Sequence, residues 1–262
     1  MSNFLFVPVA LAYLLIIGLL FLFGMYYFYI VLLAHRFKGD QDLEPEIDEW
    51  PSVTVQLPIF NEMYVAERLI RRAGQLDYPT AKLEIQVLDD STDETRQIAC
   101  KAVQALKAEG LNIQYLHREQ REGFKAGALR EGFRQASGEF LAIFDADFLP
   151  PKMFLRKTVP HLADPEIAFV QTRWGHINRN FSFLTYMQAL TLDSHFIIEQ
   201  FARSKAGLWF NFNGTAGVWR AKAIAEAGGW QAHTLTEDLD LSYRAFLKGW
   251  KAKYLRDVVV PA

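Results

Sequence analysis

From Ser52 onward, short apolar runs alternate with longer segments whose apolar residues recur every three or four positions. A short apolar run bounded by turn residues is typical of a buried strand, and the wider spacing is typical of an amphipathic helix. Strands are predicted at 52–57, 83–88, 112–117, 139–144, 167–172 and 253–260. Helices are predicted at 62–75, 91–108, 125–136 and 150–163, the second opened by a capping box of Ser91 and Glu94. This alternation implies an α/β domain whose mostly parallel sheet is flanked by helices.

The regular alternation of strands and helices ends after Trp174. The segment 181–204 is predicted to be one long helix, and 211–219 a glycine-containing loop that runs into a short strand. Thr236 is placed to cap a further helix that ends near Lys248. No internal repeat and no low-complexity tract interrupts the chain.

The N-terminal region differs in kind, because residues 4–34 contain no charged residue. About 20 helical residues cross a bilayer, so this run predicts one transmembrane helix. A signal peptide would have a shorter apolar core and a basic segment before it. His35, Arg36 and Lys38 follow the run directly, and positive residues on that flank predict a cytoplasmic location for the rest of the chain, at the cell membrane. Residues 35–51 are predicted to be a linker, and 52–262 the catalytic domain.

Composition and missing motifs argue against several classes of function. The chain has 262 residues, of which 51% are hydrophobic, and a formal net charge of −2. That balance gives no electrostatic footprint for nucleic acid, and the single cysteine, Cys100, excludes an internal disulfide. The sequence contains no Gly-x-Ser-x-Gly elbow, no His-Glu-x-x-His pair and no Walker-type glycine loop, which disfavours hydrolases and nucleotide-hydrolysing folds.

Carboxylates gather where three predicted strands end. Glu62 follows the first strand, Asp89 and Asp90 follow the second, and Asp145 and Asp147 follow the fourth. Residues two apart in extended chain point to the same side, so the last pair can converge on one cation. Each cluster alone is also what a strand-end turn or a helix entry looks like. Together they predict a shared crevice at the carboxyl edge of the sheet, where open α/β sheets bind ligands.

Two further stretches contain residues that could bind a ligand or take part in catalysis. Lys125 opens a helix between Gly123 and Gly127, glycines that would let the backbone approach an anionic ligand closely. A lysine and a metal ion together would clamp a diphosphate. Thr236-Glu237-Asp238, by contrast, is what an ordinary helix start looks like, so from its residues alone it is predicted to be structural.

Five ordered motifs resemble those of the membrane-embedded family 2 glycosyltransferases, the cellulose synthase-like and glucomannan synthase-like group. They are Leu57-Pro-Ile-Phe-Asn-Glu62, Asp89-Asp-Ser-Thr-Asp93, Lys125-Ala-Gly-Ala-Leu129, Asp145-Ala-Asp147 and Thr236-Glu-Asp238. The resemblance covers residues 52–262 and implies a GT-A type, Rossmann-like fold and a nucleotide-sugar donor, a UDP- or GDP-hexose.

The resemblance also implies roles for individual residues. Phe60, Glu62, Asp89 and Asp90 would bind the nucleotide end of the donor, and Lys125 its diphosphate. Asp145 and Asp147 would bind the donor through Mg²⁺ or Mn²⁺, and Asp238 would be the general base. The loop of Asn213, Gly214 and Thr215, together with Glu237, would bind the acceptor.

Two features depart from the family pattern. Phe60 stands where the family has a tyrosine, and the Gln-x-x-Arg-Trp motif expected after Asp238 is missing. Gln171-Thr-Arg-Trp174 has the wrong spacing and precedes Thr236. We therefore expect this chain to be the N-terminal portion of a longer enzyme, one that could be inactive by itself.

The leading hypothesis is an inverting, metal-dependent glycosyltransferase that extends a β-linked polysaccharide at the cytoplasmic membrane face. One alternative is a glycosyltransferase that makes a glycolipid or a lipid-linked sugar. The other is a catalytically silent membrane protein that only binds nucleotide sugars.

Overall fold

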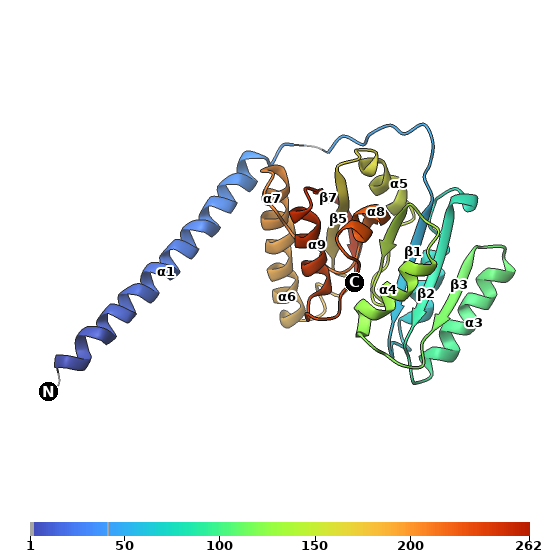
Figure 1. The fold of residues 1–262 in the computed structure, drawn as a ribbon, viewed down its shortest axis with the longest axis horizontal. Coiled ribbons are helices and arrows are strands. Elements are labelled where there is room, and N and C mark those ends of the chain that lie inside the picture. The colour runs from blue at the N-terminus through green and yellow to red at the C-terminus, as the bar shows by residue number, and fades with distance from the viewer. Residues whose placement is uncertain (1–2, 41) are drawn as a thin grey trace.

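A computed structural model describes residues 3–40 and 42–262. An α/β domain follows one long helix, α1 (Asn3–Arg36), which projects away from the domain (Figure 1). The strands are β1 (Val53–Ile59), β2 (Leu83–Asp89), β3 (Ile113–His117), β4 (Phe140–Ile143), β5 (Ile167–Gly175), β6 (Gly217–Arg220) and β7 (Lys251–Pro261). The helices of the domain are α2 (Ala66–Ala73), α3 (Thr95–Ala108), α4 (Phe124–Gln135), α5 (Phe154–Thr158), α6 (Phe183–Asp193), α7 (Phe201–Lys205), α8 (Ala221–Glu226) and α9 (Glu237–Leu247).

The seven described strands form one sheet in the order β3-β2-β1-β4-β6-β5-β7. All neighbouring pairs are parallel except those of β6, which runs antiparallel to both β4 and β5. The chain moves outward from β1 to β2 and β3, and then returns to place β4 on the other side of β1. The carboxyl ends of β1 and β4 therefore flank a topological switch point, where loops diverge and leave a crevice.

Helices cover both faces of the sheet, so a hydrophobic core lies on each face. Alternate side chains of a strand contribute to one core or the other. Phe140 and Ala142 of β4 pack with α2, α3 and α5, whereas Leu141 and Ile143 pack on the opposite face with α4, α8 and α9. Successive side chains of a strand point to opposite faces. The apolar pattern of β1 and β2 is interrupted by buried polar residues, and these pair across the two strands: Thr54 with Glu84 and Gln56 with Gln86.

The helix α1 is long and apolar enough to cross a bilayer, and most of its side chains are exposed. Its last turns are different, because Ile30 and Leu33 are buried against Ala202 of α7. The first part of α1 thus stands away from the domain, while its end is fixed to it (Figure 1).

Most predicted elements are present, with some corrections at their ends. The capping box at Ser91 and Glu94 is wrong: α3 begins at Thr95, whose backbone N–H donates to Asp93 Oδ1 over 2.9 Å. The helix predicted at 150–163 divides into α5 and the 3₁₀ turn η2 (Val159–Leu162), because Pro160 cannot donate a helical hydrogen bond. A further 3₁₀ turn, η1 (Thr80–Lys82), precedes β2.

The long helix predicted after Trp174 is confirmed, with one addition. Between α6 and α7 the backbone widens into a π-helical segment, η3 (Ser194–Gln200). Such widened turns are frequent at functional sites.

Candidate active site

A cavity of about 250 Å³ opens at the switch point between β1 and β4. Its lining comes from the ends of three strands and from the turn that enters α4. Six of the predicted donor-site residues meet here: Phe60, Glu62, Asp90, Lys125, Asp145 and Asp147. The tertiary structure thus brings together motifs that are up to 87 positions apart in the sequence.

Asp89 does not belong to the lining of this cavity. Its buried carboxylate accepts hydrogen bonds from the Tyr115 hydroxyl over 2.5 Å and from the Ser91 backbone N–H over 3.0 Å. Its partners therefore lie within the fold, where it joins β2 to β3. A direct role for Asp89 in donor binding stays a prediction.

Two arginines that the motifs did not identify support this side of the cavity: Arg121 belongs to its lining, and Arg118 binds Asp90 from outside it. Arg118 binds both carboxylate oxygens of Asp90, with 2.7 Å between Arg118 Nε and Asp90 Oδ1. The guanidinium of Arg121 lies 3.5 Å from the ring centroid of Phe60, a cation–π contact. Arg118 directly follows β3, so the signal that could have found it is the same strand-end position that identified the acids.

Lys125 forms an ion pair with Asp145, and its Nζ donates a hydrogen bond to Gly214 O over 3.1 Å. Burial raises the pKa of the Asp145 carboxyl, and the Lys125 charge opposes that rise. Burial also raises the pKa of Glu62, and the carboxylates of Asp147 and Asp145 add to the effect. Negative charge is therefore concentrated at this edge of the sheet, with Lys125 as the cation closest to it.

The loop between α7 and β6 is built around Gln171 of β5. The Gln171 Nε2 donates to Thr215 O over 3.1 Å and to Ala216 O over 3.2 Å, and its Oε1 accepts from the Asn213 N–H over 2.9 Å. The Thr215 hydroxyl in turn accepts from the Asp145 N–H over 2.9 Å. Gln171 thus connects the predicted acceptor loop to the donor site. Its sequence context, Gln171-Thr-Arg-Trp174, indicates only a motif with the wrong spacing.

Among the described residues, three other than glycine adopt left-handed backbone conformations, and each lies within or next to one of the motifs. Asn61 has φ 54°, Phe124 φ 50° and Ala216 φ 54°. Such conformations are disfavoured for residues with a Cβ and concentrate at functional sites. Asn61 also joins two strand ends, because its Oδ1 accepts from the Thr92 N–H over 2.9 Å.

The predicted role of Gly127 in approaching a ligand needs a correction. A Cβ at this position would lie 2.0 Å from the carbonyl oxygen of Glu122, so the glycine is required by the turn of its own chain. Gly123 is the helix cap and has φ 70°, a conformation that glycine adopts without strain.

The helix α9 brings Glu237 and Asp238 to the same region. A Cβ placed on Gly214 would lie 3.3 Å from Asp238 Oδ2 and 3.4 Å from Lys125 Nζ, so the two side chains meet at this loop. Burial raises the pKa of both Glu237 and Asp238. Thr236 occupies the cap position, but its hydroxyl makes no capping hydrogen bond.

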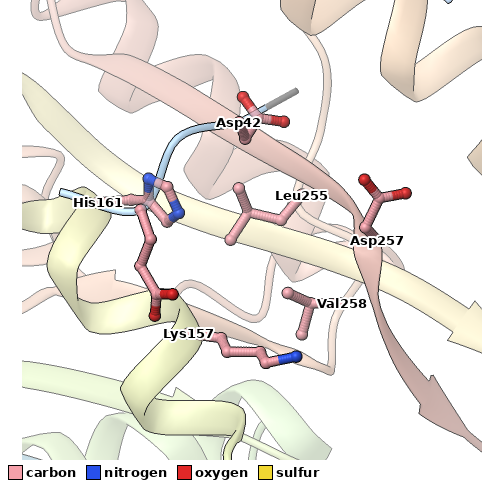
Figure 2. A pocket seen from close by; sticks show the side chains of 7 residues that line it. Asp42, Lys157, His161, Leu255, Asp257 and Val258 are labelled. Carbon is pink, nitrogen blue, oxygen red and sulfur yellow. The ribbon is translucent and has the colours of Figure 1, made fainter. Parts of the chain in front are cut away.

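A second cavity, of about 160 Å³, lies away from these motifs, between the linker, η2 and β7 (Figure 2). Asp42, Lys157, His161 and Asp257 contribute its polar lining. His161 is buried there, and burial lowers its pKa to about 4, so its imidazole is neutral at physiological pH.

Residues 51–261 match the model of a protein family described as glycosyltransferase-like family 2. The chain belongs to this family. Over 224 residues it is 47% identical to glucomannan 4-beta-mannosyltransferase 2 of Arabidopsis thaliana, covering 84% of this chain and 42% of that protein. It is 49% identical over 216 residues to the probable glucomannan 4-beta-mannosyltransferase 11 of Oryza sativa subsp. japonica, covering 80% of this chain and 38% of that one. This glycosyltransferase chain thus spans about two fifths of the length of these relatives.

Solved structures agree with the expected fold. The mannosyltransferase PcManGT from Pyrobaculum calidifontis, in complex with GDP-Man and Mn²⁺, superposes with a TM-score of 0.72 at 28% identity, covering 91% of this chain and 66% of that one. S. aureus TarS 1–349 in complex with UDP-GlcNAc, with a TM-score of 0.60 and 18% identity over 80% of this chain and 58% of that one, shares the fold. The family 2 resemblance and the GT-A type fold are confirmed.

Proposed function

We propose that this chain carries the donor site and the catalytic base of an inverting mannosyltransferase that extends a β-linked polysaccharide from GDP-mannose. The observation that carries the proposal is the convergence of Lys125, Asp145 and Asp147 on one cavity, with Asp238 beside it. The similarity to glucomannan mannosyltransferases and to a mannosyltransferase with GDP-Man supports mannose as the sugar and guanine as the base.

The proposed reaction is a direct displacement. An acceptor hydroxyl oxygen forms a bond to the anomeric carbon of mannose, while the bond from that carbon to the phosphate oxygen breaks. The electron pair of the broken bond leaves with GDP, and the hydroxyl proton passes to the Asp238 carboxylate. Attack from the side opposite the diphosphate converts an α-linked donor into a β-linkage.

Lys125 supports the leaving group electrostatically. Its ammonium group lies between Asp145 and the carbonyl of Gly214, at the edge of the cavity where a diphosphate would end. Fixed positive charge beside a group that gains negative charge stabilises the transition state more than the ground state.

The residues at this edge fit a divalent cation. Asp147 is exposed at the cavity, and its carboxylate makes no hydrogen bond or ion pair with the part of the chain that the structure describes. Within that part no group of three or more potential ligands is found, so Asp145 and Asp147 would share the cation with phosphate oxygens. Oxygen donors suit both Mg²⁺ and Mn²⁺. A bound cation would neutralise charge on the diphosphate.

Two substitutions test the proposal in the full-length chain. Asp147→Ala is expected to abolish the Mn²⁺ dependence of GDP-mannose binding, measured by calorimetry; binding that stays metal-dependent would refute the metal assignment. Asp238→Asn is expected to lower transfer at least about 100-fold while donor affinity is kept. Transfer that persists would remove Asp238 as the base, and a wild-type chain that binds GDP-mannose without any transfer would favour a binding protein.

We further propose that α1 anchors the chain in a bilayer, with the catalytic domain on the cytoplasmic side. The apolar, exposed first part of α1 and the positive residues after it support this arrangement. Cys100 is the sole cysteine and is partly exposed on α3, so it can report on orientation. A membrane-impermeant maleimide is expected to label it in inverted vesicles and not in right-side-out vesicles; the opposite result would reverse the orientation.

A further inference from the structure

An ordered polar network lies directly behind the predicted acceptor loop, in the π-helical segment η3. The imidazole of His195 is held on both sides: its Nδ1 lies 3.0 Å from Glu199 Oε2, and its Nε2 lies 3.2 Å from Asn213 Oδ1. Both η3 residues are partly buried, and neither lines the donor cavity. The network therefore contacts the acceptor loop from outside the donor cavity.

The side chain of Asn213 is oriented by this contact. Its Oδ1 faces His195 and also accepts from Asn211 Nδ2 over 3.1 Å. Its own Nδ2 has a single contact among the described residues, 3.4 Å to Asn211 O. An amide whose oxygen is held inward presents its two N–H donors elsewhere. The next residue, Gly214, lies beside both Lys125 and Asp238, so the loop that carries Asn213 reaches the proposed reaction centre.

The protonation state of His195 decides whether the contact is attractive. Gln200 Nε2 lies 3.0 Å from the same His195 Nε2. A neutral imidazole that donates from Nδ1 to Glu199 would accept from Gln200 and turn a lone pair toward Asn213 Oδ1. The imidazolium donates from both nitrogens and holds both Glu199 and Asn213. In that state the Gln200 amide turns its Oε1, which has no partner among the described residues, toward Nε2, because two N–H donors repel.

The surrounding charges favour the imidazolium. The hydrogen bond to Glu199 raises the pKa of His195, burial and the nearby Arg203 oppose the rise, and the contact with Asn213 adds to it. Arg203 of α7 lies 3.1 Å from the other oxygen of Glu199 and 5.6 Å from the Tyr26 ring of α1. The charged and titratable groups that face the pair are thus Arg203 and, beyond it, Tyr26.

We propose that His195 and Glu199 are positioning residues for the acceptor: the charged imidazole fixes the Asn213 amide so that its Nδ2 donates to an acceptor hydroxyl oxygen. This inference rests on the proposed function and deepens it, because it assigns acceptor alignment to residues outside the recognised motifs. Neither residue takes part in donor binding or in the transfer of the proton.

The test measures the acceptor KM and the donor Kd separately. It uses the full-length chain in lipid nanodiscs, with GDP-mannose as donor and β-mannan oligosaccharides as acceptors. His195→Leu is expected to raise the acceptor KM about tenfold, the cost of about one lost hydrogen bond, while the GDP-mannose Kd stays within about twofold. His195→Gln places an amide donor near the position of Nε2 and is expected to restore the acceptor KM. His161→Leu, which removes a buried imidazole at the second cavity (Figure 2), is the matched control and should change neither value.

The pH dependence separates positioning from a merely structural role. In the wild type the acceptor KM should rise as pH increases through the pKa of His195, because the imidazolium is lost. Glu199→Gln removes the stabilising carboxylate and should move this rise to lower pH, whereas His195→Gln should abolish it.

Several results would overturn the inference. One is an unchanged acceptor KM in His195→Leu; another is an equal loss of donor and acceptor affinity. If His195→Leu does not fold, a pH profile of His195→Gln that matches the wild type refutes the inference by itself. A wild-type chain that transfers no mannose to any β-mannan refutes the proposed function, and the inference with it.

Discussion

The Gln171→Leu substitution tests whether one buried side chain holds the acceptor loop to the sheet. Gln171 is fully buried, and leucine would keep its approximate volume while removing every hydrogen bond. Ala216 O would keep two donors, from Thr172 N–H and Thr172 Oγ1. The N–H of Asn213 and the carbonyls of Thr215 and Thr172 would lose the bonds that Gln171 makes to them.

The magnitude of the destabilisation follows mainly from the buried Thr215 carbonyl and the Asn213 N–H. A buried polar group left without a partner costs about 1–3 kcal/mol, and Asn213 is only partly buried, so we expect a loss of about 3 kcal/mol in the free energy of unfolding. For a domain of this size that corresponds to a fall in Tm of about 6–12 °C. Because Thr215 also supports the Asp145 backbone, GDP-mannose affinity should fall in parallel.

The assay is thermal unfolding of the full-length chain in detergent, followed by intrinsic tryptophan fluorescence, with donor affinity measured on the same samples. Gln97→Leu is the control, because Gln97 is exposed on α3 and its side chain makes no hydrogen bond within the described chain. Its Tm should change by no more than about 2 °C. A Gln171→Leu protein with the same Tm as this control and normal donor affinity would refute the argument.

Three further outcomes are expected. Arg118→Met leaves the buried Asp90 carboxylate without its main partner and should lower stability by about 3 kcal/mol; unfolding midpoints in detergent check this, and a change below about 1 kcal/mol would contradict it. Gly127→Ala puts a methyl group into the Glu122 carbonyl and should destabilise by about 1–3 kcal/mol by the same measurement, whereas a neutral effect would contradict the close approach. Since burial raises the pKa of Asp238 and a base must be ionised, kcat/KM should fall with decreasing pH at values above the ordinary aspartate range of about 4; a rate–pH profile that is flat down to pH 4 would show otherwise.

Much of the fold could be predicted from the sequence because its signals are local. Apolar periodicity fixes whether a segment buries one stripe or both faces, and this placed the strands and the long helix at 181–204 close to their observed bounds. The apolar run at 4–34 needs no tertiary context to be recognised, since its length alone suits a bilayer. The carboxylates that follow the predicted strands could also be identified, because the end of an apolar run is a local signal.

The sequence could not show which strand ends share an edge. That depends on the order of the strands, with β4 beside β1 and β6 inserted antiparallel between β4 and β5. This order brings the Asn213–Ala216 loop against Asp145, and it turns the Asp89 carboxylate toward Tyr115. Neither arrangement has a local signature.

The supporting residues were missed for a related reason. Arg118, Gln171 and His195 carry no motif of their own, and each is defined by what it touches across 18 to 42 positions of the sequence. A buried glutamine or histidine becomes informative only when its partners are known, because burial of an unpaired polar group is unfavourable. The sequence by itself therefore determined the types of chemistry present and the segments that carry them. Only the tertiary structure decided which groups meet, since hydrogen bonds and charges act over a few ångströms in space and not along the chain.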